Sequence, residues 1–400
     1  MTPLLDAAAA IAADITELRH AIHREPEIGL DLPRTQRKVL GALDGLPLEI
    51  ACGQELSSVT AVLRGGRPGP TVLLRGDMDA LPVTEATGLS FASAIDGAMH
   101  ACGHDLHTAM LAGAARLLSD RRADLAGNVI FMFQPGEEGL GGAEIMIREG
   151  VLEATGERPI AAYGLHVMSD RHATGQFTTI PGPMMAAADV LKVTVRGRGG
   201  HASRPHASAD PIPAACEMVT ALQTMVTRRF DVFDPVVITV GSFHAGTVNN
   251  VIPDEAIFHA TARSFSDDAR KRLEEESARL VRNIAAGYGL TADVRWEPGY
   301  PVTVNDAGEA AFASACSLAL FGSQRTAALE HPVPGAEDFS YVLREVPGAF
   351  IFLGACPAGT NPDGAPSNHS ARAVFDDEVI ADGMTLLSEL ALRRLAAEGR

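Results

Sequence analysis

Hydrophobic residues follow two different periodicities along this chain, and the outer regions carry the first. Apolar positions at helical spacing predict a helix over residues 5–24 that ends before Pro26. Continuous apolar runs then occur at residues 71–74, 129–133, 160–165 and 349–353, separated by helical or loop segments. Strands that are buried on both faces have this composition. The outer regions therefore predict an α/β domain with a mixed, mostly parallel sheet covered by helices.

The middle of the chain alternates apolar and polar residues in the manner of half-buried strands. Strands are predicted at residues 189–195, 236–240, 257–263 and 292–296, with helices at 211–229 and 268–286. The order strand, helix, strand, strand, helix, strand is the split βαβ pattern of a ferredoxin-like α+β domain. We expect this domain at residues 185–298, inserted into a catalytic domain formed by residues 1–184 and 299–400.

Composition narrows the class of protein. A chain of 400 residues with 46% hydrophobic and 21% charged residues is typical of a globular protein with two domains. The net charge of −17 argues against binding to nucleic acid or to an anionic membrane surface. The five cysteines are scattered, and no basic leader precedes the first apolar stretch, so we expect a cytoplasmic protein. The sequence has no long apolar run, so we expect no transmembrane span.

Polar residues follow the predicted strands directly. Asp77 and Asp79 come after the first run, Glu137 and Glu138 after the second, and His166 after the third. The carboxyl ends of parallel strands meet at one edge of the sheet, where ligands bind in open α/β folds. The sequence thus predicts one site built from several segments, although each residue alone has a structural explanation.

The segment at residues 100–107 concentrates three histidines, one thiol and one carboxylate before a predicted helix. In an extended segment, Cys102 and His104 would point the same way and could bind one zinc-like ion, with Gly103 allowing the backbone to bend. The alternative is that Cys102 is a small buried hydrophobe and that the histidines cap the helix.

Two pairs of acidic residues admit both a chemical and a structural interpretation. Glu137 and Glu138 lie on a Pro-Gly turn, so that one carboxylate could bind metal while the other transfers protons. The alternative is a solvated acidic turn. Asp77 and Asp79 could orient a ligand imidazole or could cap a turn.

Further candidates lie in the middle domain. His201 projects from a glycine-rich turn and could donate a hydrogen bond to an oxyanion. Residues 247–253 offer amide groups, and Arg263 offers a guanidinium that matches a carboxylate. An exposed surface cation is the competing explanation for Arg263.

The motifs taken together resemble the M20 peptidases, most closely the branch of hippurate hydrolases and auxin-conjugate amidohydrolases. The resemblance runs from about His20 to Phe375 with every motif in order. The motifs are Gly-Asp-Met-Asp-Ala-Leu-Pro, His-Ala-Cys-Gly-His-Asp, Gln-Pro-Gly-Glu-Glu-Gly, Gly-Leu-His-Val, Gly-Gly-His-Ala-Ser, Asn-Val-Ile-Pro, Gly-Ala-Glu-Asp-Phe and Asn-His-Ser.

The resemblance implies a role for each site residue. It implies two divalent ions per subunit, zinc, manganese, cobalt or nickel, bound by Cys102, His104, Glu138, His166 and His369. It also implies Glu137 as general base, a lid domain through which the chain forms a homodimer or a tetramer, and a His201 that reaches the partner's active site. Asn250 and Arg263 would lie near the substrate carboxylate. The broader superfamily has a metal-binding histidine where this chain has Asp77, and Cys102 stands near the bridging carboxylate of those relatives.

These expectations lead to a metal-dependent amidohydrolase that cleaves N-acetyl or N-aroyl amino acids to a carboxylic acid and a free amino acid. Its catalytic residues would be Glu137, His201 and Asp79. The alternatives are a dipeptidase, a carboxypeptidase or an N-carbamoyl amino acid hydrolase with the same site, and a noncatalytic protein that binds metal or amino acids.

Overall fold

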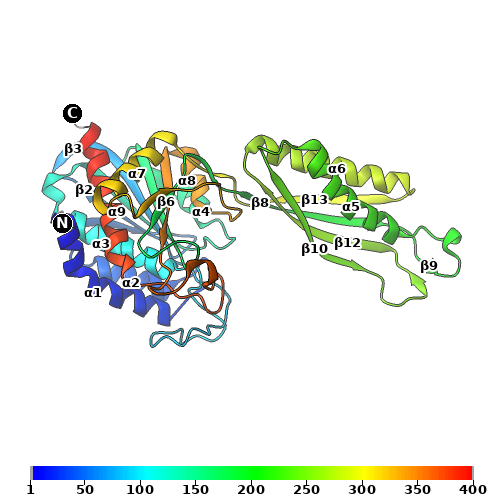
Figure 1. Ribbon diagram of the computed structural model, residues 1–400, viewed down its shortest axis with the longest axis horizontal. Coiled ribbons are helices and arrows are strands. Elements are labelled where there is room, and N and C mark those ends of the chain that lie inside the picture. The colour runs from blue at the N-terminus through cyan, green and yellow to red at the C-terminus, as the bar shows by residue number, and fades with distance from the viewer. Residues whose placement is uncertain (1–2, 399–400) are drawn as a thin grey trace. The chain divides into compact units, whose positions relative to one another are not determined.

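The computed structural model describes residues 3–398 and divides into two compact units (Figure 1). The larger unit consists of Met1–Met184, Val304–His331 and Asp338–Arg400. The smaller unit consists of Met185–Thr303 and Pro332–Glu337. Among residues 3–398, no helix is long and apolar enough to cross a membrane.

An eight-stranded sheet forms the centre of the larger unit, with the strand order β1-β2-β4-β3-β5-β16-β6-β15. The four central strands, β4, β3, β5 and β16, run parallel, whereas β1 and β2 at one edge are antiparallel. The prediction of a mixed, mostly parallel sheet is therefore confirmed. The strands are β1 (Leu48–Cys52), β2 (Val59–Arg64), β3 (Arg67–Asp77), β4 (Ala126–Gln134), β5 (Ala161–Met168), β6 (Phe177–Thr179), β15 (Thr326–Ala328) and β16 (Gly348–Gly354).

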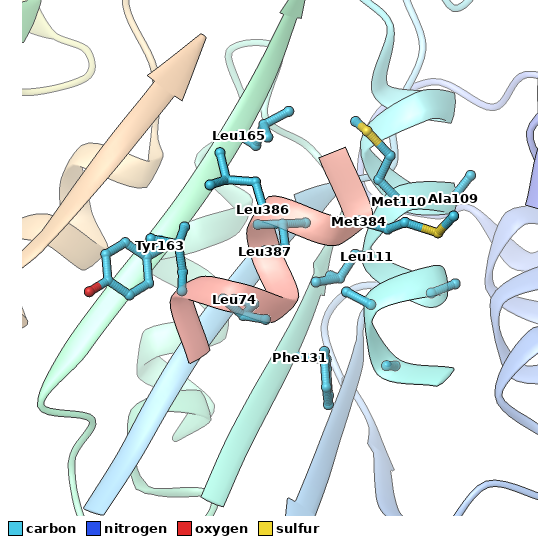
Figure 2. Close-up of a cluster of buried hydrophobic side chains, with 14 of the residues drawn as sticks. Leu74, Ala109, Met110, Leu111, Phe131, Tyr163, Leu165, Met384, Leu386 and Leu387 are labelled. Carbon is cyan, nitrogen blue, oxygen red and sulfur yellow. The ribbon is translucent and has the colours of Figure 1, made fainter. Parts of the chain in front are cut away.

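Helices cover this sheet. Helices α3 and α9 pack against β3, and α1 packs against both of these helices. Figure 2 shows Leu386 and Leu387 of α9 close to Leu74 and Tyr163 on the strands, with Met110 on the neighbouring α3. The helices of this unit are α1 (Pro3–Arg24), α2 (Pro33–Leu43), α3 (His104–Asp120), α4 (Gly142–Arg148), α7 (Ala307–Phe321), α8 (Phe339–Glu345) and α9 (Val379–Glu398).

The smaller unit has a four-stranded antiparallel sheet in the order β10-β12-β8-β13. Its strands are β8 (Ala187–Arg196), β10 (Val236–Ala245), β12 (Glu255–Ser264) and β13 (Thr291–Pro298), and its helices are α5 (Pro211–Arg229) and α6 (Asp267–Gly287). Chain order and strand order are those of the split βαβ fold. Alternate residues such as Leu191, Val193 and Phe258 are buried beneath the helices, which explains the alternation in the sequence.

Short elements complete the two units. Strands β9 (Gly200–His201) and β11 (Val251–Ile252) pair with each other, and β7 (Gly182–Met185) pairs with β14 (Thr303–Asn305). Single 3-10 turns are η1 (Arg122–Asp124), η2 (Val151–Glu153), η3 (Pro205–Ala207) and η4 (Pro362–Gly364).

Candidate metal centre

The carboxyl ends of β3, β4 and β5 bring three of the predicted segments to one edge of the sheet. Asp77 is the last residue of β3, and Glu137 and Glu138 follow β4 after Gly136, which adopts a left-handed φ of 72°. His166 lies within β5, two residues before its end, and not after the strand as the sequence had suggested. Because β3, β4 and β5 pair in parallel, their carboxyl ends lie at one edge of the sheet and bring these polar residues together there, as the sequence predicted.

The segment around Cys102 differs from its prediction. Cys102 and His104 do not lie in an extended segment, because Gly103 is left-handed with a φ of 85° and His104 begins helix α3. A Cβ atom on Gly103 would lie 2.3 Å from Cγ2 of Val167, so this tight turn requires glycine. No side chain caps the start of α3, which removes the explanation that the histidines serve as caps.

Ligand-type atoms gather into overlapping groups in which all atoms lie within 4.8 Å of one another. These groups contain the five residues expected to bind metal, together with Glu137. Both ring nitrogens of His104 are buried and lack a partner at hydrogen-bond distance, although Nδ1 lies 3.5 Å from Asp79 and Nε2 lies 3.6 Å from Asp77. A bound ion would give one of these nitrogens a partner. A thiol, imidazoles and a carboxylate form a donor set that suits zinc-like divalent ions. The groups are Cys102, His104 and His166; Cys102, Glu138 and His369; and His104, Glu137 and Glu138.

Local hydrogen bonds fix the tautomer of His166. Nδ1 lies 2.8 Å from the backbone oxygen of Val167, which can only accept, so Nδ1 carries the proton. The lone pair of Nε2 is then directed towards Sγ of Cys102, 3.4 Å away. Burial is the main cause that holds the pKa of His166 well below its usual value. A neutral imidazole with a free Nε2 is the form that binds metal.

Both carboxylate oxygens of Asp77 contact protein side chains. Its Oδ1 accepts a hydrogen bond of 2.5 Å from Nδ1 of His107, and its Oδ2 lies 2.6 Å from Nη1 of Arg75. Nε2 of His107 accepts the backbone N–H of Val167, so this ring is neutral and both of its nitrogens are occupied. Asp77 and His107 form a close group with His104, and their contacts with each other and with Arg75 are of the kind made by groups that orient metal-binding imidazoles.

Asp79 joins two parts of the site. Its two carboxylate oxygens accept the backbone N–H groups of Glu137 and Glu138, each at 3.0 Å. Oδ1 also lies 3.5 Å from Nδ1 of His104. One buried carboxylate therefore holds the Glu-Glu turn and faces the imidazole of His104, which is the arrangement of a group that orients a side chain.

Glu138 and His369 form a pair at the exposed side of the site. Nε2 of His369 lies 3.2 Å from Oε1 of Glu138. In the absence of ions, hydrogen bonds to Cys102 and Glu138 raise the pKa of His369 to about 10. Although burial raises the pKa of Glu138, its hydrogen bond with His369 and the charge of His104 give a net lowering. The carboxylate of Glu138 attracts cations, whereas His369 must release its proton before its imidazole can bind one.

The remaining predicted residues lie in the smaller unit. His201 on β9 is exposed and pairs with Val251, and the backbone oxygen of Asn250 accepts the N–H of Ala202 at 3.1 Å. His201 and Asn250 are therefore neighbours. Arg263 lies on β12 in the four-stranded sheet, opposite Val237, and is half-buried.

Several supporting residues were not found from the sequence. Arg75 is fully buried and binds Gln134 and Asp338, and Asp338 also accepts the N–H of Ala143 at the start of α4. The signals for this cluster were the Gln-Pro-Gly-Glu-Glu-Gly motif that begins with Gln134 and the Gly-Ala-Glu-Asp-Phe motif that contains Asp338. Other such residues are Asp105, which pairs with Arg19, and Asn368, which contacts Cys102.

Comparison with known proteins identifies the family to which this chain is similar. The model of peptidase family M20/M25/M40 matches residues 73–393. Thermostable carboxypeptidase 2 of Saccharolobus solfataricus is 37% identical and covers 95% of both chains. N-acetylcysteine deacetylase of Bacillus subtilis is also 37% identical, over 94% of this chain and 96% of its own. A dinuclear metal-binding M20 peptidase from Bacillus subtilis superposes with a TM-score of 0.83 at 32% identity and covers 97% and 99% of the two chains.

The fold and the cluster of metal-binding side chains define a metal-dependent hydrolase of amide bonds. This chain belongs to peptidase family M20/M25/M40.

Proposed function

We propose that this protein hydrolyses N-acyl amino acids at their amide bond, with two divalent ions per subunit held by Cys102, His104, Glu138, His166 and His369. The observation that carries the proposal is the convergence of these ligand atoms, within 4.8 Å in each group, beside the carboxylate of Glu137. The deacetylase relative supports an N-acyl substrate.

Glu137 is the proposed general base. Ions bound at this site would polarise the substrate carbonyl and acidify water. The Glu137 side chain is buried, Asp79 fixes its backbone, and its carboxylate lies within 4.8 Å of ligand-type atoms of His104 and Glu138. It takes a proton from the attacking water, whose oxygen bonds to the carbonyl carbon. It then passes this proton to the nitrogen as the C–N bond breaks, and a carboxylic acid and a free amino acid result.

His201 is the proposed donor to the oxyanion. Its Nδ1 accepts the backbone N–H of Ser203 at 3.2 Å, which leaves the proton on Nε2. An exposed Nε2–H is a suitable donor to a negatively charged oxygen. Asn250 beside it and the half-buried Arg263 are the proposed contacts of the substrate carboxylate.

The replacement Glu137→Gln tests the central step. We expect turnover to fall by at least about a thousandfold, because this replacement removes a group that acts in both proton transfers of the reaction. Metal content, measured by elemental analysis, should stay at two ions per subunit. The exposed Glu157 provides the control Glu157→Gln, which should retain full activity. Loss of metal from Glu137→Gln would make Glu137 a ligand.

Substrate class is tested by a screen. Metal-free enzyme refilled with manganese, zinc, cobalt or nickel is assayed on N-acetyl, N-benzoyl and N-carbamoyl amino acids and on dipeptides. We expect the highest kcat/KM on N-acetyl or N-benzoyl amino acids. The carboxypeptidase relative favours peptide hydrolysis as the second candidate, and preferential cleavage of dipeptides would select it. No turnover on any substrate would indicate a binding protein.

We further propose a homodimer in which His201 of each subunit acts in the other subunit's site. Glu137→Gln and His201→Ala variants would each be inactive. Mixed dimers should recover activity, because one of their two sites then has both residues intact. The measurement is kcat after the two variants are dissociated together and reassembled, and unchanged inactivity of the mixture would place both residues in the same subunit's site.

A further inference from the structure

The side chain of Asn368 lies between the segments that carry three of the five proposed ligands. Its Oδ1 accepts hydrogen bonds from the backbone N–H and from the hydroxyl of Ser169, both at 2.9 Å. Its Nδ2 donates to the backbone oxygens of Val167 at 3.0 Å and Cys102 at 3.2 Å. The same nitrogen lies 3.7 Å from Sγ of Cys102.

The orientation of this amide is fixed by its neighbours. The N–H of Ser169 can only donate, so the atom that faces it must be the oxygen. The oxygens of Val167 and Cys102 can only accept, so they must face the NH2 group. The two N–H bonds serve three acceptors, and the backbone oxygen and the sulfur of Cys102 therefore share one of them.

Each contacted segment bears a proposed ligand. Cys102 is a ligand itself, Val167 directly follows His166, and Asn368 directly precedes His369. His369 has a left-handed φ of 72°, which is uncommon for a residue with a side chain, and its backbone N–H donates to Ala101 at 2.8 Å. The backbone of His369 and the side chain of Asn368 thus bind the same turn at residues 101–102.

We propose that Asn368 is a positioning residue of the metal centre. Its amide sets the relative placement of Cys102, His166 and His369, and its N–H directs the sulfur of Cys102. The inference rests on the proposed function in taking these three residues as metal ligands. Groups that orient ligands typically change metal affinity by about tenfold to a hundredfold when they are replaced.

The test uses Asn368→Ala and Asn368→Asp in the full chain, with cobalt(II) titrated into the metal-free protein. The aspartate variant keeps an acceptor for Ser169 and loses both N–H donors. We expect cobalt to bind about tenfold to a hundredfold more weakly in both variants, with a weaker or shifted thiolate-to-cobalt charge-transfer band. Asn361→Ala is the matched control, because Asn361 is exposed on the same connection and caps only η4. It should bind cobalt as the wild type does.

The outcomes separate this inference from the proposed function. A wild-type protein that binds cobalt without a thiolate band would refute the ligand set, whatever Asn368 does. A wild-type band that both Asn368 variants reproduce with unchanged affinity would overturn the positioning role. Circular dichroism checks the fold of each metal-free variant, and if Asn368→Ala does not fold, the isosteric Asn368→Asp carries the test.

Discussion

Asp79 acts at the scale of a single residue, because one carboxylate supports two parts of the site. Its oxygens accept the N–H groups of both Glu137 and Glu138, and it faces the imidazole of His104. The proposed base and a proposed ligand therefore depend on the same side chain. Asp77, the other aspartate of this motif, differs from Asp79 because its two carboxylate oxygens are bound by the side chains of His107 and Arg75.

Replacement of Asp79 by asparagine should weaken catalysis more than substrate binding. The amide has nearly the same shape, but its NH2 group would face a backbone N–H that needs an acceptor. We expect kcat to fall by roughly tenfold to a hundredfold with little change in KM, as for other groups that orient metal ligands. Steady-state kinetics checks this result, with the exposed Asp96→Asn as control. A change confined to KM would contradict the positioning role.

At the scale of elements, helix α1 is joined to the start of α3 by buried charges. Nε of Arg19 lies 2.7 Å and Nδ1 of His23 lies 2.8 Å from Oδ2 of Asp105, and all three side chains are buried. Asp105 follows His104 directly, so this ion cluster fixes the helix end that carries a proposed ligand. A buried cluster of this kind costs desolvation and is stable only because its members are paired.

The same cluster predicts a dependence of stability on pH. Burial by itself lowers the pKa of His23, but the charge of Asp105 and hydrogen bonds to Asp105 and Glu85 raise it to about 8. A raised pKa means that the folded state binds the proton more tightly than the unfolded state. The stabilisation is therefore complete below pH 6.5 and is lost as pH rises through about 8.

The measurement is urea unfolding between pH 6 and 9 of the wild type and of His23→Gln, both with metal. The difference in the free energy of unfolding should shrink by about 2 kcal/mol over this range. The exposed His206→Gln is the control and should track the wild type. A constant difference between wild type and His23→Gln would show that His23 does not gain its proton on folding.

At the scale of the whole molecule, all five proposed ligands belong to the larger unit, whereas His201, Asn250 and Arg263 belong to the smaller one. Ligand binding stabilises only the structure that contains the binding site. Metal should therefore act on the stability of one unit and leave the other nearly unchanged.

Metal removal tests this asymmetry. Chelation from a thousandfold excess over Kd should cost the larger unit about 4 kcal/mol. Amide hydrogen exchange should then accelerate in α3 and β5, while α5 and α6 of the smaller unit serve as the internal control. Equal acceleration in both units would show that metal stabilises the molecule as a single cooperative body.

The sequence by itself determined the four central strands of the larger unit, the strands and helices of the smaller unit, and the kinds of chemistry. Periodicity is a local property, so the buried strands, the split βαβ order and the polar residues at strand ends could be predicted from neighbouring residues. Cys102 and His104 were expected in an extended segment in which Gly103 lets the backbone bend, whereas Gly103 makes a left-handed turn into α3. The error arose because glycine permits both conformations.

Only the tertiary structure decided which groups meet. Arg19 reaches Asp105 across 86 residues, and Asn368 reaches Cys102 across 266. No periodicity records such a pairing, because it depends on how strands and helices pack in three dimensions. The contacts on which the proposed roles of Asp77 and Asn368 rest were decided in the same way, since a carboxylate or an amide acquires its partner from the fold and not from its neighbours in the chain.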